Sequence, residues 1–411
     1  MEPTRILHVL SQRPSRTGSG ITLDSLVALA EGPRWHQAAV VGVPWNDTGF
    51  TVGSLPTHRL FPVRFGHPEA DLPFPVPGMS DVMPYPSSVW SRLQTDQLAA
   101  YRRIWRRHLQ HVIGTFRPHL IHSNHIWLVS SLLKDLAPDL PVVTTSHATG
   151  LRQMDLTPHL RHEVIAGCRR NDHFLALRGD HARQLTETLG VEPARATVCG
   201  VGFREDFFHA GAPHPPRDPG HLLYVGKYSR AKGLPWLLDA FTTLHREHPD
   251  LVLHIAGDGA GAEAEGLRAR MQAMAPQVVL HGMLDQPGLA DLMRRCTLMV
   301  LPSFYEGVPL VLVEAAACGC RLVATDLPGV REEIAPHLGA ALRSVPLPRL
   351  QNVDVPLAAD LPALVHNLRE ALAASLAEPA GPTPDLGRFT WQAVFRRVER
   401  VWSDTLAGCR Q

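Results

Sequence analysis

The chain has 411 residues, 45% of them hydrophobic, which suits two globular domains better than one. Its 40 basic and 39 acidic side chains leave a formal net charge of +1, a balance that argues against a nucleic-acid-binding protein. No apolar run reaches the length of a membrane-spanning helix, and the run at residues 6–10 is too short for a signal peptide, so we expect a cytoplasmic protein with at most peripheral membrane contact.

The cysteines indicate neither a disulfide framework nor a metal site. Cys318 and Cys320 flank a glycine in an apolar run, and no pair of cysteines has the spacing of zinc ligands. We therefore predict buried, reduced thiols in a reducing compartment and no metal site. The six cysteines are Cys168, Cys199, Cys296, Cys318, Cys320 and Cys409.

The first half of the chain alternates short β-rich runs with helical patterns. A strand at residues 6–10 is followed by a glycine-containing loop at 17–20 and a helix at 21–30. Residues 44–96 lose this periodicity and are rich in proline, glycine and aromatic residues, so we expect a long loop or insertion that lines a site. A strand at 37–43 precedes this segment, and after it the pattern resumes with a helix at 97–116 and strands at 120–122 and 142–145.

The second half repeats the alternation and ends in a helix at residues 391–406. The pattern predicts two doubly wound, Rossmann-like α/β domains that face a central cleft, where ligands would bind beyond the carboxyl ends of the strands. The strands of this half are expected at 222–225, 251–256, 278–281, 298–301 and 321–324.

Two glutamates flank the start of a predicted helix. Pro309 suits the first helical position, and the free amides from Gly307 and Leu310 onward would form an anion site beside Glu306. Glu314 lies in an apolar run, where its carboxylate needs a partner such as a ribose diol. The alternative is that Glu306 caps the helix and Glu314 pairs with an arginine, and spacing alone does not decide between the two.

A basic loop follows the strand at 222–225. Lys227 and Lys232 stand five residues apart, and Gly226 and Gly233 would let the backbone approach a diphosphate. A solvated basic loop is the alternative reading. Earlier in the chain, Gly18 and Gly20 suggest a flexible loop that closes over a bound donor.

Histidines stand at the ends of two predicted strands. His147 would reach the cleft, where it could contact a sugar hydroxyl or the reacting region. For His122 and for Asn124 with His125, a structural role is the better interpretation. The arginines of the helix at 97–116 are expected on a solvated face, in preference to a contact with anionic lipid or acceptor: Arg102, Arg103, Arg106 and Arg107.

Taken together in order, these motifs resemble the retaining glycosyltransferases of family 4, which have the GT-B fold. The resemblance covers most of the chain and is strongest between residues 222 and 333. Its motifs are the basic loop with Lys227 and Lys232, the segments 253–259 and 279–283, Pro302-Ser303 with Glu306 to Glu314, Ser146-His147, and Phe389-Thr390-Trp391 at the start of the last helix.

The resemblance implies an N-terminal domain at 1–205, a nucleotide-sugar-binding domain at 206–388, and a helix at 389–411 that crosses back to the first domain. It also implies a division of roles. Glu306 and His147 would contact the sugar, Glu314 the ribose, and Lys227 and Lys232 the departing diphosphate. The donor would further contact Gly18, Gly20, Gly226, Gly282, Met283, Gly307, Val308 and Leu310.

The reaction that the resemblance implies is transfer of a hexose-type sugar, with retention of configuration, from a nucleoside diphosphate sugar to an unidentified acceptor. Uridine as the base is drawn from the family, and no metal or other cofactor is expected. Two departures bear on diphosphate binding: Lys227 stands where the family usually has arginine, and the segment 198–203 (Val-Cys-Gly-Val-Gly-Phe) stands where many members have a Pro-Asn-Gly turn.

Other functions of the same fold are a nucleotide-sugar epimerase, a phosphorylase and a non-catalytic nucleotide-sugar-binding protein. No lysine in a pyridoxal-phosphate context is evident, which weighs against the phosphorylase. The presence of Lys232, Glu306 and Glu314 argues against loss of catalysis.

Overall fold

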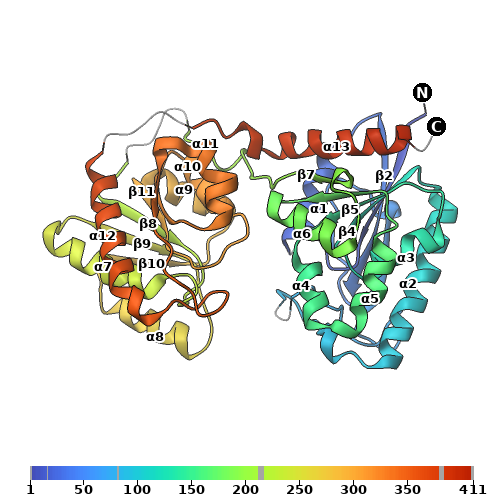
Figure 1. The fold of residues 1–411 in the computed structure, drawn as a ribbon, viewed down its shortest axis with the longest axis horizontal. Coiled ribbons are helices and arrows are strands. Elements are labelled where there is room, and N and C mark those ends of the chain that lie inside the picture. The colour runs from blue at the N-terminus through green and yellow to red at the C-terminus, as the bar shows by residue number, and fades with distance from the viewer. Residues whose placement is uncertain (1, 16, 81–82, 212–216, 379–383, 409–411) are drawn as a thin grey trace. The chain divides into compact units, whose positions relative to one another are not determined.

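The structure is a computed structural model that describes residues 2–15, 17–80, 83–211, 217–378 and 384–408. The chain forms two compact units, one of Met1–Gly202 with Trp391–Gln411 and one of Phe203–Thr390 (Figure 1). We describe each by itself. Within the described residues, no helix is long and apolar enough to cross a membrane.

Unit 1 is a three-layer α/β unit around a seven-stranded parallel sheet of order β3-β2-β1-β4-β5-β6-β7. Helices α2, α3, α5 and α6 cover one face, and α1 and α13 cover the other. Its elements are β1 Thr4–Leu10, α1 Gly18–Leu29, β2 Trp35–Pro44, β3 Leu60–Phe65, α2 Thr95–Phe116, β4 Leu120–Asn124, α3 Leu128–Leu136, β5 Val142–Ser146, α4 Thr149–Leu156, α5 Pro158–Cys168, β6 His173–Ala176, α6 Gly179–Leu189, β7 Ala196–Val198 and α13 Trp391–Gly408.

Unit 2 has the same layered plan around a six-stranded parallel sheet of order β10-β9-β8-β11-β12-β13. Helices α7, α8 and α12 pack on one face, and α9, α10 and α11 on the other. The elements are β8 His221–Val225, α7 Leu234–Glu247, β9 Val252–Ala256, α8 Ala262–Gln272, β10 Val278–Gly282, α9 Gln286–Arg295, β11 Leu298–Leu301, α10 Leu310–Ala317, β12 Arg321–Thr325, α11 Ala335–Leu338, β13 Leu342–Val345 and α12 Leu361–Ala377. Two doubly wound Rossmann-like units are the architecture that the sequence predicts.

The segment 44–96 differs from the expectation of a long loop. Its residues Leu60–Phe65 form β3, which extends the sheet in parallel beside β2. Pro62 is tolerated because β3 is an edge strand, where one row of backbone amides needs no partner. Phe74 and Trp90 from the same segment are buried in the main core of unit 1, so these aromatic side chains stabilise the domain. Asp81 and Val82, also in this segment, lie outside the described residues.

The last helix, α13, belongs to unit 1. Trp402 is fully buried and makes edge-on ring contacts with His8, Trp35 and His122. At the helix start, a Cβ atom at Gly202 would collide with the Trp391 indole. The first and last residues of unit 2 lie side by side, because Phe203 pairs with Thr390 in a parallel β-bridge.

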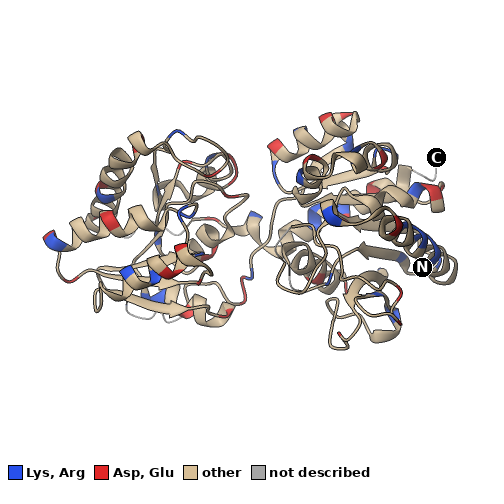
Figure 2. Ribbon diagram, turned by 90° about the horizontal axis from the view of Figure 1, so that it is seen from below, with Lys and Arg blue, Asp and Glu red and all other residues tan. Residues whose placement is uncertain are grey.

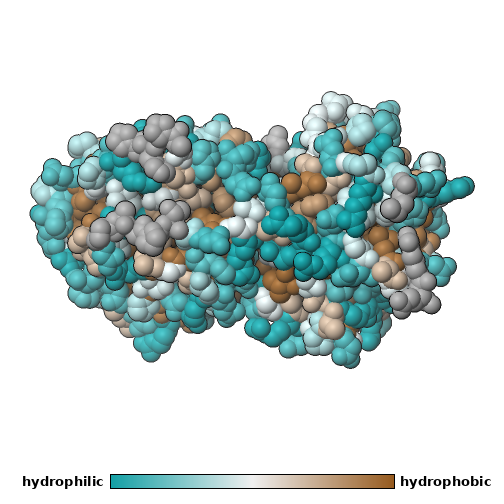
Figure 3. Space-filling view, turned by 90° about the horizontal axis from the view of Figure 1, so that it is seen from above, coloured by the Kyte–Doolittle hydropathy of each residue, from teal (hydrophilic) through white to brown (hydrophobic). Residues whose placement is uncertain are grey.

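Basic and acidic side chains are interspersed over both units (Figure 2). On the face in Figure 3, hydrophobic residues form separate areas between hydrophilic ones.

Candidate functional site

In unit 2, the candidate donor-binding residues gather at the carboxyl ends of β8 and β11. These strands are neighbours in the sheet. The chain continues from β8 to β9 on one side of the pair and from β11 to β12 on the other side. Ligands of doubly wound sheets bind at such a switch point. Gly226 and Lys227 directly follow β8, while Ser303 and Glu306 follow β11.

Lys232 and Glu306 form an ion pair at this point. The Lys232 Nζ atom lies 2.6 Å from Glu306 Oε1, and the Ser303 hydroxyl donates to the same oxygen at 2.9 Å. Both charged side chains are mostly buried, with 26% and 18% of their surface exposed. The ammonium keeps further N–H groups with which it could bind an anion, since Glu306 occupies one of them.

Two glycines allow this close approach. Gly233 has φ +71°, and a Cβ atom there would collide with the Pro302 carbonyl oxygen at the end of β11. Gly257 has φ +141°, and its Cβ would collide with the Gly226 carbonyl oxygen. The Phe304 amide donates to the Ala231 carbonyl oxygen at 3.0 Å, which joins the two loops directly. Glycine is needed here for backbone contact, so the basic loop is part of a built structure.

The start of α10 differs from the expectation of free amides. Pro309 occupies the position before the helix, and the Leu310 amide turns back to donate to the Val308 carbonyl oxygen at 2.9 Å. Pro309 has φ −77° and ψ 83°, the geometry of an inverse γ-turn. The Leu310 amide is therefore engaged. Among the described residues, the Val308 amide has no acceptor.

Glu314 is largely buried in α10. Burial raises the pKa of its carboxyl to about 7. Within the described residues, no hydrogen bond or ion pair satisfies the carboxylate, so the arginine partner of the structural alternative is absent. A carboxylate held in this way is ready to accept hydrogen bonds from a ligand's hydroxyl groups.

The other donor candidates of unit 2 lie around the same sheet edge. Lys227 is exposed, and its backbone carbonyl accepts a hydrogen bond of 2.8 Å from the buried Tyr224 hydroxyl. Gly282, at the end of β10, has φ +65° and bonds through its carbonyl to the Gly257 amide at 2.8 Å. Met283 follows with 77% of its surface exposed, an unusual exposure for an apolar side chain that could contact a nucleobase. Gly307 is exposed and has open space around it.

In unit 1, His147 lies beyond the carboxyl end of β5. Its Nε2 atom lies 3.0 Å from Asn124 Oδ1, while Asn124 Nδ2 donates to the Val9 carbonyl oxygen at 3.3 Å. Burial lowers the pKa of His147 to about 4, so the ring is neutral at pH 7. With its Nε2–H donated to Asn124, the Nδ1 lone pair can accept a hydroxyl proton.

The neighbouring histidines are structural or supporting. His122 is buried and bonds to the Thr145 hydroxyl at 2.7 Å. His125, with φ +70°, lies with its ring centroid 4.9 Å from that of His147 and approaches the Thr149 hydroxyl at 3.2 Å. Burial lowers the pKa of both His122 and His125 well below the usual value, so both are neutral at pH 7.

Gly18 and Gly20 do not form a flexible loop. They lie in the first turn of α1, where the Thr17 hydroxyl accepts from the Gly20 amide at 3.2 Å. Gly20 is buried, and its Cβ would meet the Ser15 backbone nitrogen, whereas Gly18 is exposed with nothing nearby. The N-terminus of α1 is therefore accessible at Gly18, whereas Gly20 allows the helix backbone to pack closely against the Ser15 backbone.

The remaining predicted features are structural. Arg102 pairs with Glu163 through two hydrogen bonds, and Arg106 pairs with Asp135 at 2.9 Å, so part of the arginine face packs against neighbouring helices. Five cysteines are buried free thiols, and Cys409 lies outside the described residues. No group of histidine, cysteine or acidic side chains in the described parts of the chain has the arrangement of a metal site.

Sequence comparisons match both units to families of known proteins. Residues 73–207 match the family described as Glycosyltransferase Family 4, and residues 219–344 match Glycosyl transferases group 1. The glycogen synthase of Mycobacterium tuberculosis (strain ATCC 25618 / H37Rv) is 31% identical over 72% of this chain and 71% of its own length. The phosphatidyl-myo-inositol mannosyltransferase of the same strain is 31% identical over 83% of this chain and 86% of its own length.

Solved structures share the whole fold at low sequence identity. Sucrose-phosphate synthase from Thermosynechococcus elongatus has a TM-score of 0.59 and 17% identity, covering 98% of this chain and 100% of that one. HepE of Anabaena, solved in complex with UDP and glucose, also has a TM-score of 0.59 and 17% identity, covering 97% and 99% of the two chains. The likeness to these structures concerns the fold alone.

Proposed function

The chain belongs to the glycosyltransferases of family 4 and has their GT-B fold, and from this premise we propose that it is a retaining enzyme that transfers a hexose from a UDP-sugar to an acceptor. The single observation that carries the donor-site assignment is the Lys232–Glu306 ion pair at the switch point of unit 2. It places a cation and a hydroxyl-binding carboxylate side by side, as a sugar diphosphate requires.

Each donor group has a partner in this site. Lys232 and the exposed Lys227 bind the diphosphate, with the Val308 amide as an additional donor. Glu306 accepts hydrogen bonds from sugar hydroxyls, and Glu314 from the ribose diol. Met283 packs against the uracil. The positive charges stabilise the diphosphate as it departs, and this electrostatic effect supplies the main part of the catalysis.

Retention follows from attack on the same face that the diphosphate leaves. Glu306 is held by both Lys232 and Ser303, which orients its carboxylate for binding rather than for nucleophilic attack. The acceptor hydroxyl attacks the anomeric carbon while the leaving diphosphate oxygen takes up its proton. His147 orients the sugar, because its neutral ring offers the Nδ1 lone pair.

The names of the relatives suggest the first acceptors to test. Two of them are described as glycogen synthase and phosphatidyl-myo-inositol mannosyltransferase, and others as D-inositol 3-phosphate glycosyltransferase. We propose a polyhydroxylated acceptor of this kind, an α-glucan or an inositol derivative. Since the donor is easier to identify, it is assayed first.

The test measures nucleoside diphosphate release from UDP-glucose, UDP-galactose, ADP-glucose and GDP-mannose, with and without glycogen, phosphatidylinositol and inositol 3-phosphate. We expect release with a UDP-sugar and stimulation by one acceptor. Anomeric configuration of the product is then read from its proton NMR coupling constants. Donor binding without release under all conditions would refute the transferase proposal, and an inverted product would refute retention.

Substitutions in the ion pair test the site. Lys232→Ala and Glu306→Ala are each expected to lower turnover by at least about 100-fold, because each removes a group that stabilises the transition state. Arg246→Ala and Glu265→Ala remove the same charges from exposed positions of unit 2 and should leave turnover unchanged. Wild-type rates in the first two variants would refute the assignment.

A further inference from the structure

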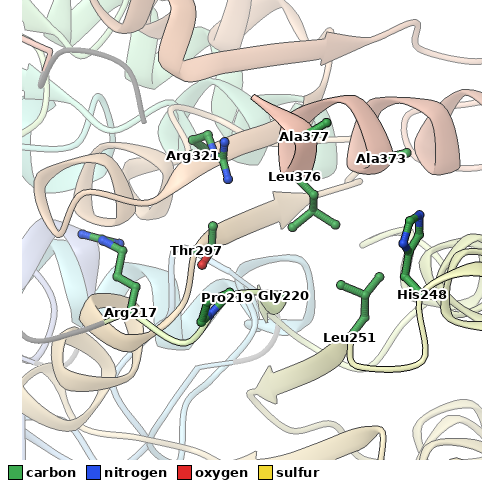
Figure 4. Close-up of a pocket in the computed structure, with 10 residues that line it drawn as sticks. All are labelled: Arg217, Pro219, Gly220, His248, Leu251, Thr297, Arg321, Ala373, Leu376 and Ala377. Carbon is green, nitrogen blue, oxygen red and sulfur yellow. The ribbon is translucent and has the colours of Figure 1, made fainter. Parts of the chain in front are cut away.

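A cavity of about 670 Å³ opens at the opposite edge of the unit 2 sheet, where the strands begin (Figure 4). Gly220, Leu251 and Thr297 directly precede β8, β9 and β11, and Arg321 is the first residue of β12. Helix α12 supplies the remaining wall through Leu376 and its neighbouring alanines. The volume is in the range of pockets that bind small organic molecules.

The cavity is divided into a basic and an apolar part. Figure 4 shows Arg217 and Arg321 on one side, Leu251 with His248 on the other, and Leu376 projecting between them. A ligand that fills both parts must carry a charged end and an apolar body. Pockets of this composition select amphipathic molecules, since the charge fixes the orientation and the apolar contact supplies the area.

Arg321 has an unused guanidinium. Its Nη1 atom is buried and has no hydrogen-bond partner. No ion pair joins the side chain to another residue in the described part of the chain. Burial lowers the pKa of Arg321 from its ordinary value, because the charged guanidinium loses part of its hydration. A buried N–H group without an acceptor is unfavourable, and an anion that accepts from Nη1 would relieve this cost.

The surroundings of Arg321 carry an excess of positive charge. A second cavity of about 390 Å³ shares Arg321 and is also lined by Arg343 and Glu378. Glu378 forms an ion pair with Arg343 and also attracts Arg321, so a single carboxylate faces two guanidinium groups. Across both cavities the lining holds three guanidinium groups and one carboxylate.

Arg217 fixes the geometry of this basic end. Its Nη1 and Nη2 atoms donate to the carbonyl oxygens of Cys296 and Cys318, at 2.9 and 2.6 Å. These residues end α9 and α10, where backbone carbonyls are left over and cations are favoured. Arg217 is therefore a structural cap, and Arg321 is the group that remains available to a ligand.

We propose that this cavity binds a small amphipathic anion, with an acidic phosphate or carboxylate head group at Arg321 and an apolar body against Leu251 and Leu376. The site is distinct from the donor site. Strands of four or five residues separate the two edges of the sheet, a distance of about 15 Å at about 3.3 Å per residue. A nucleotide at Lys232 and an anion at Arg321 can therefore bind at the same time.

The experiment titrates the full chain with hexyl phosphate and with hexanoate by calorimetry, and with inorganic phosphate and hexanol as the two halves of the ligand. We expect one of the acidic probes to bind at least about tenfold more tightly than either half, because only it fills both parts of the cavity. The preferred acidic probe identifies the head group. UDP, added to saturation, should not displace it.

Two variants test the position. Arg321→Gln should weaken binding at least about tenfold because it removes the charge. Ala377→Trp keeps Arg321 and fills the cavity from the exposed end of α12, so it should also prevent binding. Arg246→Gln and Ala262→Trp are the matched exposed controls and should bind normally. Circular dichroism establishes that each variant is folded.

Several results would overturn the proposal. One is that Arg321→Gln binds the probe as tightly as the native chain does, and another is that UDP displaces the probe. The proposal is also wrong if hexanol binds as tightly as the acidic probes, or if neither acidic probe binds at millimolar concentration. Loss of binding in both cavity variants with normal binding in both controls would establish it.

Discussion

Glu314 illustrates how one residue can be costly for folding and useful for binding. It lies in the apolar part of α10, and burial raises the pKa of its carboxyl from 4.5 to about 7. The apolar run around it predicted this desolvation, whereas the lack of a protein partner became visible only in the folded chain. A shift of one unit corresponds to about 1.4 kcal/mol.

The first prediction concerns the stability of Glu314→Gln. A folded-state pKa above the unfolded value means that ionisation opposes folding. The cost is absent below pH 4.5, grows as the pH rises, and is complete above about pH 7. We expect the variant to increase the free energy of unfolding by up to about 3 kcal/mol at pH 8 and to change it little at pH 4.5.

Urea unfolding followed by circular dichroism at both pH values measures the effect. Glu265→Gln, at an exposed position of α8, is the matched control and should show no pH-dependent difference. A variant at residue 314 that is equally destabilised at pH 4.5 and pH 8 would show that Glu314 has a structural partner.

The second prediction concerns donor affinity. Hydroxyl groups that donate to Glu314 favour its ionised form, so binding lowers the pKa from about 7. The affinity for UDP-glucose should therefore be constant above pH 7.5 and fall by up to about tenfold per unit below pH 7. UDP-glucose is used because its diphosphate does not itself titrate there. Calorimetry should show proton release at pH 7, and Glu314→Gln should abolish both effects. A pH-independent affinity in the native chain would contradict the ribose assignment.

At the scale of the elements, α13 joins the core of the unit to which the first strands belong. Trp402 is 0% exposed and contacts both His8 and His122, while Arg397 donates to the Cys199 carbonyl oxygen at 2.8 Å. The predicted helix at 391–406 thus forms part of the layer that covers the sheet, together with α1.

The third prediction is that Trp402→Ala lowers the free energy of unfolding of unit 1 by about 3–5 kcal/mol, because it removes a large buried side chain and leaves a cavity. Trp45→Ala is the control: that side chain is 38% exposed, although it stacks on His67, and its loss should cost less than about 1 kcal/mol. Urea unfolding followed by circular dichroism compares the two. Equal losses would show that α13 is not integrated into the core.

The elements also show what the sequence could predict. Buried runs such as Leu298–Leu301 predicted the strands correctly because both faces of a parallel sheet are covered. Strand β3 was missed because Pro62 and a weak alternation hide an edge strand. The start of α1 was missed because glycine disfavours helix, although Thr17 was a visible cap.

The site was predictable in its residue types but not in its contacts. Apolar neighbours made Glu314 a candidate, and its position after a strand made Glu306 one. The pairing of Lys232 with Glu306 joins residues 74 positions apart and depends on Gly233 meeting the end of β11, which no local pattern encodes. The same holds for Asn124 and His147, whose hydrogen bond requires β4 and β5 to be neighbours.

At the scale of the whole molecule, the two units differ in how strongly acid destabilises them. Unit 1 buries four histidines whose pKa values burial lowers, to about 4 for His8 and His147 and well below the usual value for His122 and His125. Unit 2 has three partly buried histidines with lowered pKa values, His254, His281 and His337, and it also carries Glu314, whose ionisation cost is relieved by acid.

The pKa values of the folded state determine how the stability of each unit changes with pH. A histidine whose pKa is lowered by folding leaves the free energy of unfolding at its full value above the unfolded pKa of 6.5. That free energy decreases as the pH falls from there toward the folded pKa of about 4. Each such group costs up to about 1.4 kcal/mol per pH unit in that window. Unit 1 should therefore lose several kcal/mol between pH 7 and pH 5.5, while in unit 2 the losses at His254, His281 and His337 are partly offset by Glu314.

The last prediction is that acidification separates the unfolding of the two units, with unit 1 unfolding first. Seven of the eight tryptophans belong to unit 1, and only Trp236 belongs to unit 2, so tryptophan fluorescence follows unit 1 while circular dichroism follows both. In urea at pH 5.5, the fluorescence midpoint should precede the dichroism midpoint, and the gap should exceed that at pH 7.5. His8→Gln removes one of the titrating groups and should reduce the pH dependence of the fluorescence midpoint. If the gap is the same at both pH values, or if unit 2 unfolds first in acid, then the buried histidines of unit 1 do not set its acid stability.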